Sequence, residues 1–121
     1  MDIEKFRKKM NELPLDVEIT QERLEDVAKR SAKRLGCIKT SVVCMEEAAE
    51  LQQAISKKIR GKSDLVSDYN LIEEIADVIC AISSVMYIYD IEPEEVTRAM
   101  KIKLDRIEEK NEEYFNNEVL K

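Results

Sequence analysis

The sequence predicts an all-α fold, because it is rich in helix-forming residues and poor in those that strands and tight turns need. The 121 residues include only two glycines and two prolines, and aromatic residues make up 5%. Strand-rich folds depend on turn residues and on β-branched or aromatic runs. Alanine, leucine, isoleucine, glutamate, lysine and arginine dominate instead, and most of these favour helices. At this length we expect a single domain, residues 1–121.

The first part of the chain is expected to form two helices of different length. A short helix is expected over residues 2–12, within an N-terminal extension that covers residues 1–19. Pro14 ends it, because proline disfavours helical conformation in the residue before it. Thr20 is the expected N-cap of a longer helix that runs to residue 35, where Gly36 suits a helix end.

Three more long helices are expected after residue 35. Together with the helix that Thr20 begins, they make four main antiparallel helices after the short N-terminal one. Their expected ranges are 39–60, 69–89 and 93–114. An N-cap at Ser67 or Asp68 is expected to begin the second of them. Pro93 suits the first turn of the third, and the tail over residues 115–121 is expected to fray.

The helix over residues 69–89 is apolar on nearly all sides. Its apolar residues are Leu71, Ile72, Ile75, Val78, Ile79, Ile82, Val85, Met86 and Ile88. A helix of this kind must be buried on most of its circumference. One chain has too few helices to cover it, so we expect a subunit interface in a homodimer or homotetramer that forms an oligomeric helical bundle.

Charge, cysteines and hydropathy limit the classes of partner. The net charge of −6 disfavours polymeric nucleic acid, whose phosphates repel an acidic surface. An odd number of cysteines at irregular spacing, namely Cys37, Cys44 and Cys80, indicates reduced thiols in a cytoplasmic protein. The longest apolar run, residues 78–89, is shorter than the roughly 20 residues that a membrane span needs, so we expect no membrane partner.

Two pairs of carboxylates interrupt the apolar faces of two consecutive helices. Glu47 and Glu50 lie one turn apart within the apolar stripe of the 39–60 helix, and Glu74 and Asp77 repeat the pattern in the next helix. Burying unpaired charge is costly, so either basic partners or bound cations must neutralise them. With 26 acidic residues in the chain, one such pair arises easily by chance. Two pairs with the same placement favour a function.

The residue types narrow the chemistry of such a cluster. A hard divalent ion such as Mg²⁺ takes oxygen ligands, and it combines carboxylates with water and substrate phosphates. The chain has no histidine, which excludes the Glu-x-x-His di-iron bundle and any triad with a histidine base.

The two acidic motifs resemble those of the MazG-like, all-α nucleoside triphosphate pyrophosphohydrolase superfamily. The family pattern is E-E-x-x-E, a spacer, and then E-x-x-D. Here EEAAE occupies residues 46–50, and EIAD follows at residues 74–77 after 23 residues. The resemblance covers about residues 20–114.

The resemblance implies Mg²⁺-dependent hydrolysis of a (deoxy)nucleoside triphosphate to the monophosphate and pyrophosphate, a house-cleaning activity on the nucleotide pool. Mn²⁺ is a possible substitute. The implied metal ligands are Glu47, Glu50, Glu74 and Asp77. Glu47 and Glu46 are the catalytic candidates, and Glu46 either orients water as a base or is simply solvated. A cation of this kind neutralises developing charge and lowers the pKa of a bound water.

Basic residues in the last helix are candidates for binding the substrate phosphates. Family members often place lysine, arginine and asparagine here, as in Lys103, Arg106, Lys110 and Asn111. Lysine offers a point charge to phosphate and arginine a bidentate fork. The alternative is that these residues form surface pairs with acidic neighbours at i, i+4.

Two other functions stay open from the sequence. The first is a non-enzymatic helical interaction or regulatory module, whose acidic seam meets a basic partner. The second keeps the fold and changes the substrate to a phosphoribosyl nucleotide or a nucleoside diphosphate.

Overall fold

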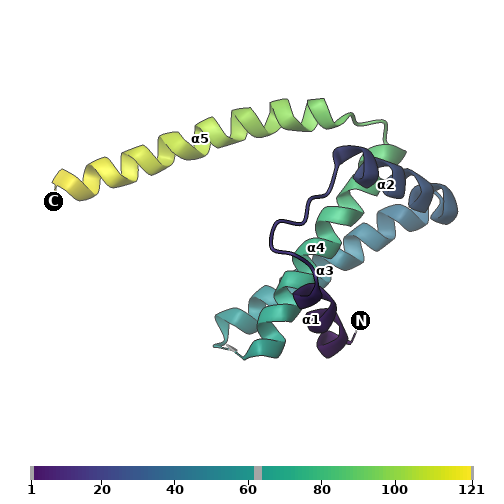
Figure 1. The fold of residues 1–121 in the computed structure, drawn as a ribbon. Helices are drawn as coiled ribbons and strands as arrows, with labels where there is room; N and C mark the ends of the chain where they lie inside the picture. The colour runs from purple at the N-terminus through teal and green to yellow at the C-terminus, as the bar shows by residue number, and fades with distance from the viewer. Residues whose placement is uncertain (1, 62–63, 121) are drawn as a thin grey trace. The chain divides into compact units, whose positions relative to one another are not determined.

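The computed structural model describes residues 2–61 and 64–120, and these residues form helices without any strand. The helices are α1 (Ile3–Glu12), α2 (Gln21–Leu35), α3 (Cys37–Ile59), α4 (Leu65–Ile88) and α5 (Pro93–Leu120) (Figure 1). The predicted all-α class is therefore confirmed. The chain divides into two compact units, residues 1–89 and 90–121. The first unit contains α1 to α4 and the second contains α5.

The beginnings of α2 and α3 follow local signals in the sequence. The Thr20 hydroxyl accepts a hydrogen bond from the Arg23 amide at 3.1 Å, which confirms Thr20 as the N-cap. Gly36 ends α2 with a φ of 86°, a conformation that glycine adopts without steric cost. α3 begins directly after it at Cys37, two residues before the predicted start.

The predicted N-cap of α4 is wrong. Asp64 caps this helix instead, because its side chain accepts a hydrogen bond from the Ser67 amide at 2.7 Å. A carboxylate placed three residues before an amide satisfies one of the donors that a helix start leaves unpaired. Residues 65–68 therefore join α4, and Asp68 forms an ion pair with Lys58 of α3.

Within the first unit, α3 and α4 form a hairpin of two helices that run side by side in opposite directions, and α2 packs against both (Figure 1). Small residues let these helices approach closely. Those that are buried are Ala28 and Ala32 of α2, Thr40 and Ala54 of α3, and Ser67 and Ser84 of α4. The Ser84 hydroxyl donates a hydrogen bond to the Ala28 carbonyl at 3.3 Å, so a polar contact fixes α2 on α4.

The N-terminal helix α1 packs against the beginning of α4. The Tyr69 hydroxyl donates a hydrogen bond to Asn11 at 3.4 Å. The guanidinium carbon of Arg7 lies 5.7 Å from the centre of the Tyr69 ring, within the range of a cation–π contact. Tyr69 therefore ties α1 to the end of the hairpin at which α4 starts.

Within a single chain, α4 keeps a row of isoleucines exposed. Ile72, Ile75, Ile79 and Ile82 each retain between 41% and 55% of their accessible surface. Their spacing places them on one side of the helix. The subunit interface stays a prediction, and the isoleucine row is the surface that would form it.

The second unit consists chiefly of α5, which is 28 residues long. The predicted end of this helix near Tyr114 is wrong, because the helix continues to Leu120, while the fraying of the tail stays a prediction. No glycine or proline interrupts residues 115–120, and the Tyr114 and Phe115 rings meet edge to face with centroids 5.1 Å apart. Among the described residues, none of the helices combines the length and the apolar character that crossing a membrane demands.

Candidate functional site

The periodicity of α3 and α4 places one glutamate of each helix in the seam between them. Glu47 lies two turns from the buried Thr40 on one side and two turns from the buried Ala54 on the other. Glu74 lies two turns from the buried Ser67. Residues seven positions apart share a face of an α-helix, so both glutamates turn toward the neighbouring helix and are partly buried.

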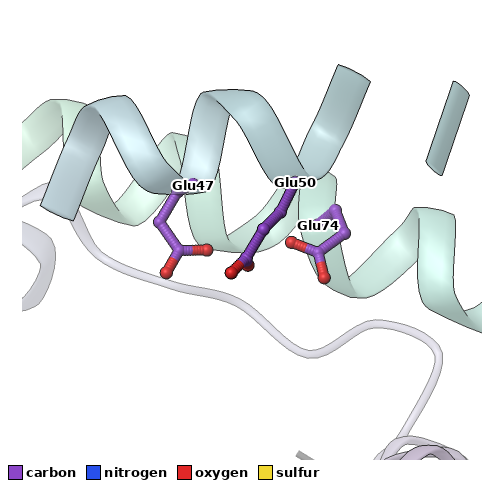
Figure 2. A group of neighbouring side chains, drawn as sticks. All are labelled: Glu47, Glu50 and Glu74. Atoms are coloured by element: carbon purple, nitrogen blue, oxygen red, sulfur yellow. The ribbon is translucent and has the colours of Figure 1, made fainter. Parts of the chain in front are cut away.

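Glu50 completes a cluster of three carboxylates with Glu47 and Glu74. Each offers an oxygen, and these oxygens all lie within 4.8 Å of one another. Figure 2 shows the three side chains leaving α3 and α4 on the same side, so that their carboxylates form one row. Glu50 is exposed, whereas one oxygen each of Glu47 and Glu74 is buried without a hydrogen-bond partner among the described residues. The cluster is thus open to solvent at Glu50, while the buried oxygens of Glu47 and Glu74 lack hydrogen bonds from the described residues.

The electrostatics of the cluster disfavour its charged state. Burial, followed by the charge of Asp77 and then those of Glu50 and Glu74, raises the pKa of Glu47 from 4.5 to about 7. Burial, and then Glu50 and Asp77, also raises the pKa of Glu74. Among the described residues, no ion pair joins these carboxylates to a lysine or an arginine. A bound cation would offset both the burial and the mutual repulsion that raise these pKa values.

The other two acidic candidates lie differently. Asp77 lines the same cleft as the three glutamates, and its charge acts on Glu47, although it is not in the group whose oxygens lie within 4.8 Å of one another. Glu46 is exposed and does not line the cleft. Three of the four predicted ligands are therefore brought together, and Asp77 forms the adjacent wall.

The cleft around the carboxylates is open and has a volume of about 550 Å³. Besides the acidic residues named above, its lining contains Ile3, Gln53, Lys57, Asn70 and Glu73. Sequence reasoning missed all five. Gln53 and Lys57 follow Glu50 at i+3 and i+7 on α3, so extending the same helical face by two turns would have found them. Ile3 carries no such signal, because it reaches the cleft only through the packing of α1 on α4.

A second cavity, of about 250 Å³, adjoins the cleft between α2, α3 and α4. Its lining is mostly apolar and includes Leu24, Leu35, Val43 and Ala81. Glu47 and Asp77 line this cavity as well as the cleft. Thr40 also lines it, is only 3% exposed, and has a hydroxyl without a hydrogen-bond partner among the described residues. An apolar cavity and a polar cleft therefore meet at two carboxylates.

The basic candidates lie in the second unit. Lys103, Arg106, Lys110 and Asn111 are exposed side chains of α5. An i, i+4 ion pair does occur on this helix, between Lys101 and Asp105 at 2.8 Å. A role of the four candidates in binding phosphate stays a prediction.

Comparisons of the chain with family models, with curated proteins and with solved structures gave no match. The resemblance to the MazG-like superfamily therefore rests on the two acidic motifs. The geometry itself offers a row of carboxylate oxygens in a polar cleft, and this cleft meets an apolar cavity at Glu47 and Asp77. Such an arrangement suits a divalent cation and a molecule with an ionic and an apolar end.

Proposed function

We propose that this chain is a Mg²⁺-dependent nucleoside triphosphate pyrophosphohydrolase of the MazG-like kind. One observation carries the proposal: Glu47, Glu50 and Glu74 converge within 4.8 Å, and buried oxygens of two of them lack partners among the described residues. Mg²⁺ prefers a few carboxylates together with water and substrate phosphates. A half-open cleft supplies the carboxylates and leaves space for the phosphates.

The residues present fit such an ion. Glu47, Glu50 and Glu74 would hold it, and Asp77 lies beside them as the fourth proposed ligand. When bound, the ion supplies charge neutralisation for the phosphates and a lowered pKa for a coordinated water. The protein's own contribution is to hold acceptor oxygens in a partly desolvated place, where their attraction for a cation is stronger than in bulk water.

The proposed reaction is a hydrolysis. The hydroxyl of water adds to the α-phosphorus, and the bond from this phosphorus to the bridging oxygen breaks. The bridging oxygen leaves with pyrophosphate, the monophosphate remains, and a proton is released to solvent. We propose a cytoplasmic role on the nucleotide pool, which fits three cysteines that are free thiols in the structure.

The experiment that tests the function is a screen for pyrophosphate release. Canonical and damaged nucleoside triphosphates are incubated with the protein, with and without Mg²⁺, and both products are identified. We expect monophosphate and pyrophosphate from at least one substrate, only with Mg²⁺ or Mn²⁺. We expect Glu50→Gln, which removes a charge of the cluster, to lose this activity. Glu108→Gln, which changes an exposed glutamate of α5, is its matched control and should keep the activity. Absence of turnover, together with a tightly bound basic protein, would support the interaction module instead.

A further inference from the structure

The polar cleft and the apolar cavity share a wall, and their linings differ in chemistry. The cleft is lined almost wholly by polar groups, whereas the cavity between α2, α3 and α4 is lined mainly by apolar side chains. Glu47 and Asp77 belong to both. A ligand that spans the junction must therefore place an apolar part on one side of these carboxylates and an ionic part on the other.

The apolar cavity contains a buried polar group, the Thr40 hydroxyl, that a ligand could satisfy. Thr40 is almost completely buried, and its hydroxyl has no hydrogen-bond partner among the described residues. Leaving a buried hydroxyl unpaired is costly. Because Thr40 lines the cavity, a heteroatom of a nucleobase or sugar in that cavity would remove the cost. The cavity's volume of about 250 Å³ is close to the lower end of the range for small-molecule sites, roughly 300 Å³.

The polar side contains the groups that suit phosphate. Lys57 lines the cleft, and it forms no ion pair or hydrogen bond with any described residue. Its spacing from Glu50 places both on one face of α3, two turns apart. Gln53 lies between them along this face, and Asn70 faces them from α4 as a further lining residue. A lysine with two amide side chains matches the oxygens of a diphosphate.

We propose that the nucleotide binds with its base and sugar in the α2–α3–α4 cavity and its phosphate chain in the cleft, so that Lys57 holds the leaving pyrophosphate. This orientation rests on the proposed function. The α-phosphorus then lies near Glu47 and Asp77, where the two spaces meet. After hydrolysis the monophosphate occupies the cavity side, and pyrophosphate occupies the side of Lys57, Gln53 and Asn70.

The reverse orientation has one residue in its favour. Arg34, an exposed residue in the last turn of α2, also lines the apolar cavity. A phosphate chain directed toward Arg34 would lie among apolar side chains, away from Lys57. In one orientation pyrophosphate contacts Lys57, and in the other it contacts Arg34. Substituting each of these residues in turn therefore shows which orientation is correct.

Calorimetric titration of the intact protein with the two products tests the orientation. The probes are inorganic pyrophosphate and the tightest-binding canonical deoxynucleoside monophosphate, each with Mg²⁺. The variants are Lys57→Gln, Arg34→Gln and Thr40→Val. Lys58→Gln is the matched control, because Lys58 is adjacent on α3 but pairs with Asp68 and does not line the cleft. Thermal unfolding of every variant establishes that it is folded.

We expect Lys57→Gln to weaken pyrophosphate binding by about ten- to a hundredfold, as for loss of a hydrogen bond to a charged group, with monophosphate binding unchanged. We expect Thr40→Val to weaken monophosphate binding by about three- to tenfold and to leave pyrophosphate binding unchanged. Equal effects of Lys57→Gln and Lys58→Gln, or weaker pyrophosphate binding only in Arg34→Gln, would overturn the orientation. So would a wild-type protein that binds neither probe.

Turnover distinguishes this inference from the proposed function. Wild-type hydrolysis with the wrong pattern of product affinities refutes the orientation alone. The expected pattern of affinities without any Mg²⁺-dependent hydrolysis refutes the proposed function and leaves the orientation of a bound nucleotide standing.

Discussion

The acidic cleft of α3 and α4 and the basic residues of α5 have similar helical spacing in the sequence but very different surroundings in the structure. Glu47 and Glu74 lie in a helix seam, and each has a buried oxygen without a partner among the described residues. Lys103 and Arg106 are exposed on α5. An exposed cation is hydrated, whereas a buried carboxylate oxygen without a partner has lost its water without replacement. Charge in a helix is therefore informative about function mainly where packing removes it from solvent.

The two regions also differ in the free energy that the loss of a partner would cost. A surface pair such as Lys101–Asp105 contributes only a few tenths of a kcal/mol, roughly 0.2–0.5. Removing the partner of a buried charge typically costs about 3–5 kcal/mol. A bound cation or protonation of the carboxyls would therefore stabilise the cleft, whereas the exposed charges of α5 are hydrated without either.

The largest expected effects come from the cleft. Glu50→Gln and Asp77→Asn each preserve the shape of the side chain and remove the charge of a proposed metal ligand. Each should therefore lower turnover by about a hundredfold or more, since metal assistance is worth several kcal/mol. Without metal, both variants should be at least as stable as the wild type, because repulsion within the cluster is relieved. Steady-state kinetics at limiting Mg²⁺ and thermal unfolding in a chelator measure the two effects. Near-normal turnover in either variant would remove that residue from the ligand set.

A second large effect is expected on the oligomeric state. It concerns the exposed isoleucine row of α4, the helix that also contributes Glu74 and Asp77 to the cleft. Exposed apolar surface of this kind favours association with another copy, so we expect a particle of at least twice the 14.1 kDa chain mass at micromolar concentration. Ile79→Lys should shift this assembly toward monomer, and Leu15→Lys, at a fully exposed position outside the row, should not. Sedimentation that gives a stable wild-type monomer contradicts the prediction.

A smaller effect is expected on α5. If Lys103 contacts the polyphosphate, as predicted, Lys103→Met should lower kcat/KM by about ten- to a hundredfold, because a charge-assisted contact contributes roughly 1.5–3 kcal/mol. Methionine keeps the helix propensity. Lys101→Met is the control, since Lys101 already pairs with Asp105. Equal kcat/KM values for the two variants would mean that Lys103 does not contact the substrate, and the proposed site would then exclude α5.

A pH dependence of stability is also expected from the cleft. The pKa of Glu47 is raised from 4.5 to about 7 by burial and by its acidic neighbours, so between these values the folded state binds more protons than the unfolded state. The free energy of unfolding of metal-free protein should therefore fall as pH rises from about 4.5 to 7, and then level off. Urea unfolding at a series of pH values measures it. Glu47→Gln should flatten the slope, and an equal slope in this variant would assign the effect to other groups.

The sequence predicted the elements whose signals are local. Thr20 as an N-cap, Pro93 in a first turn and the convergence of Glu47 with Glu74 all follow from cap preferences or from helical periodicity. Asp64 was missed because several residues competed for the cap and only the backbone geometry selects one. The end of α5 was missed because absence of a helix breaker is a weak signal. Ile3 and the apolar cavity depend on packing between segments far apart in the chain, which periodicity does not report.

Calorimetric titration of metal-free protein with Mg²⁺ and with Mn²⁺ tests whether the three converging glutamates bind a divalent cation. We expect saturable binding by the wild type and competition between the two ions. We also expect release of protons at pH 6.5, because the pKa of Glu47 is raised to about 7, and at least tenfold weaker binding by Glu50→Gln. Heats that do not saturate in the wild type, or equal affinities in the wild type and Glu50→Gln, would contradict it.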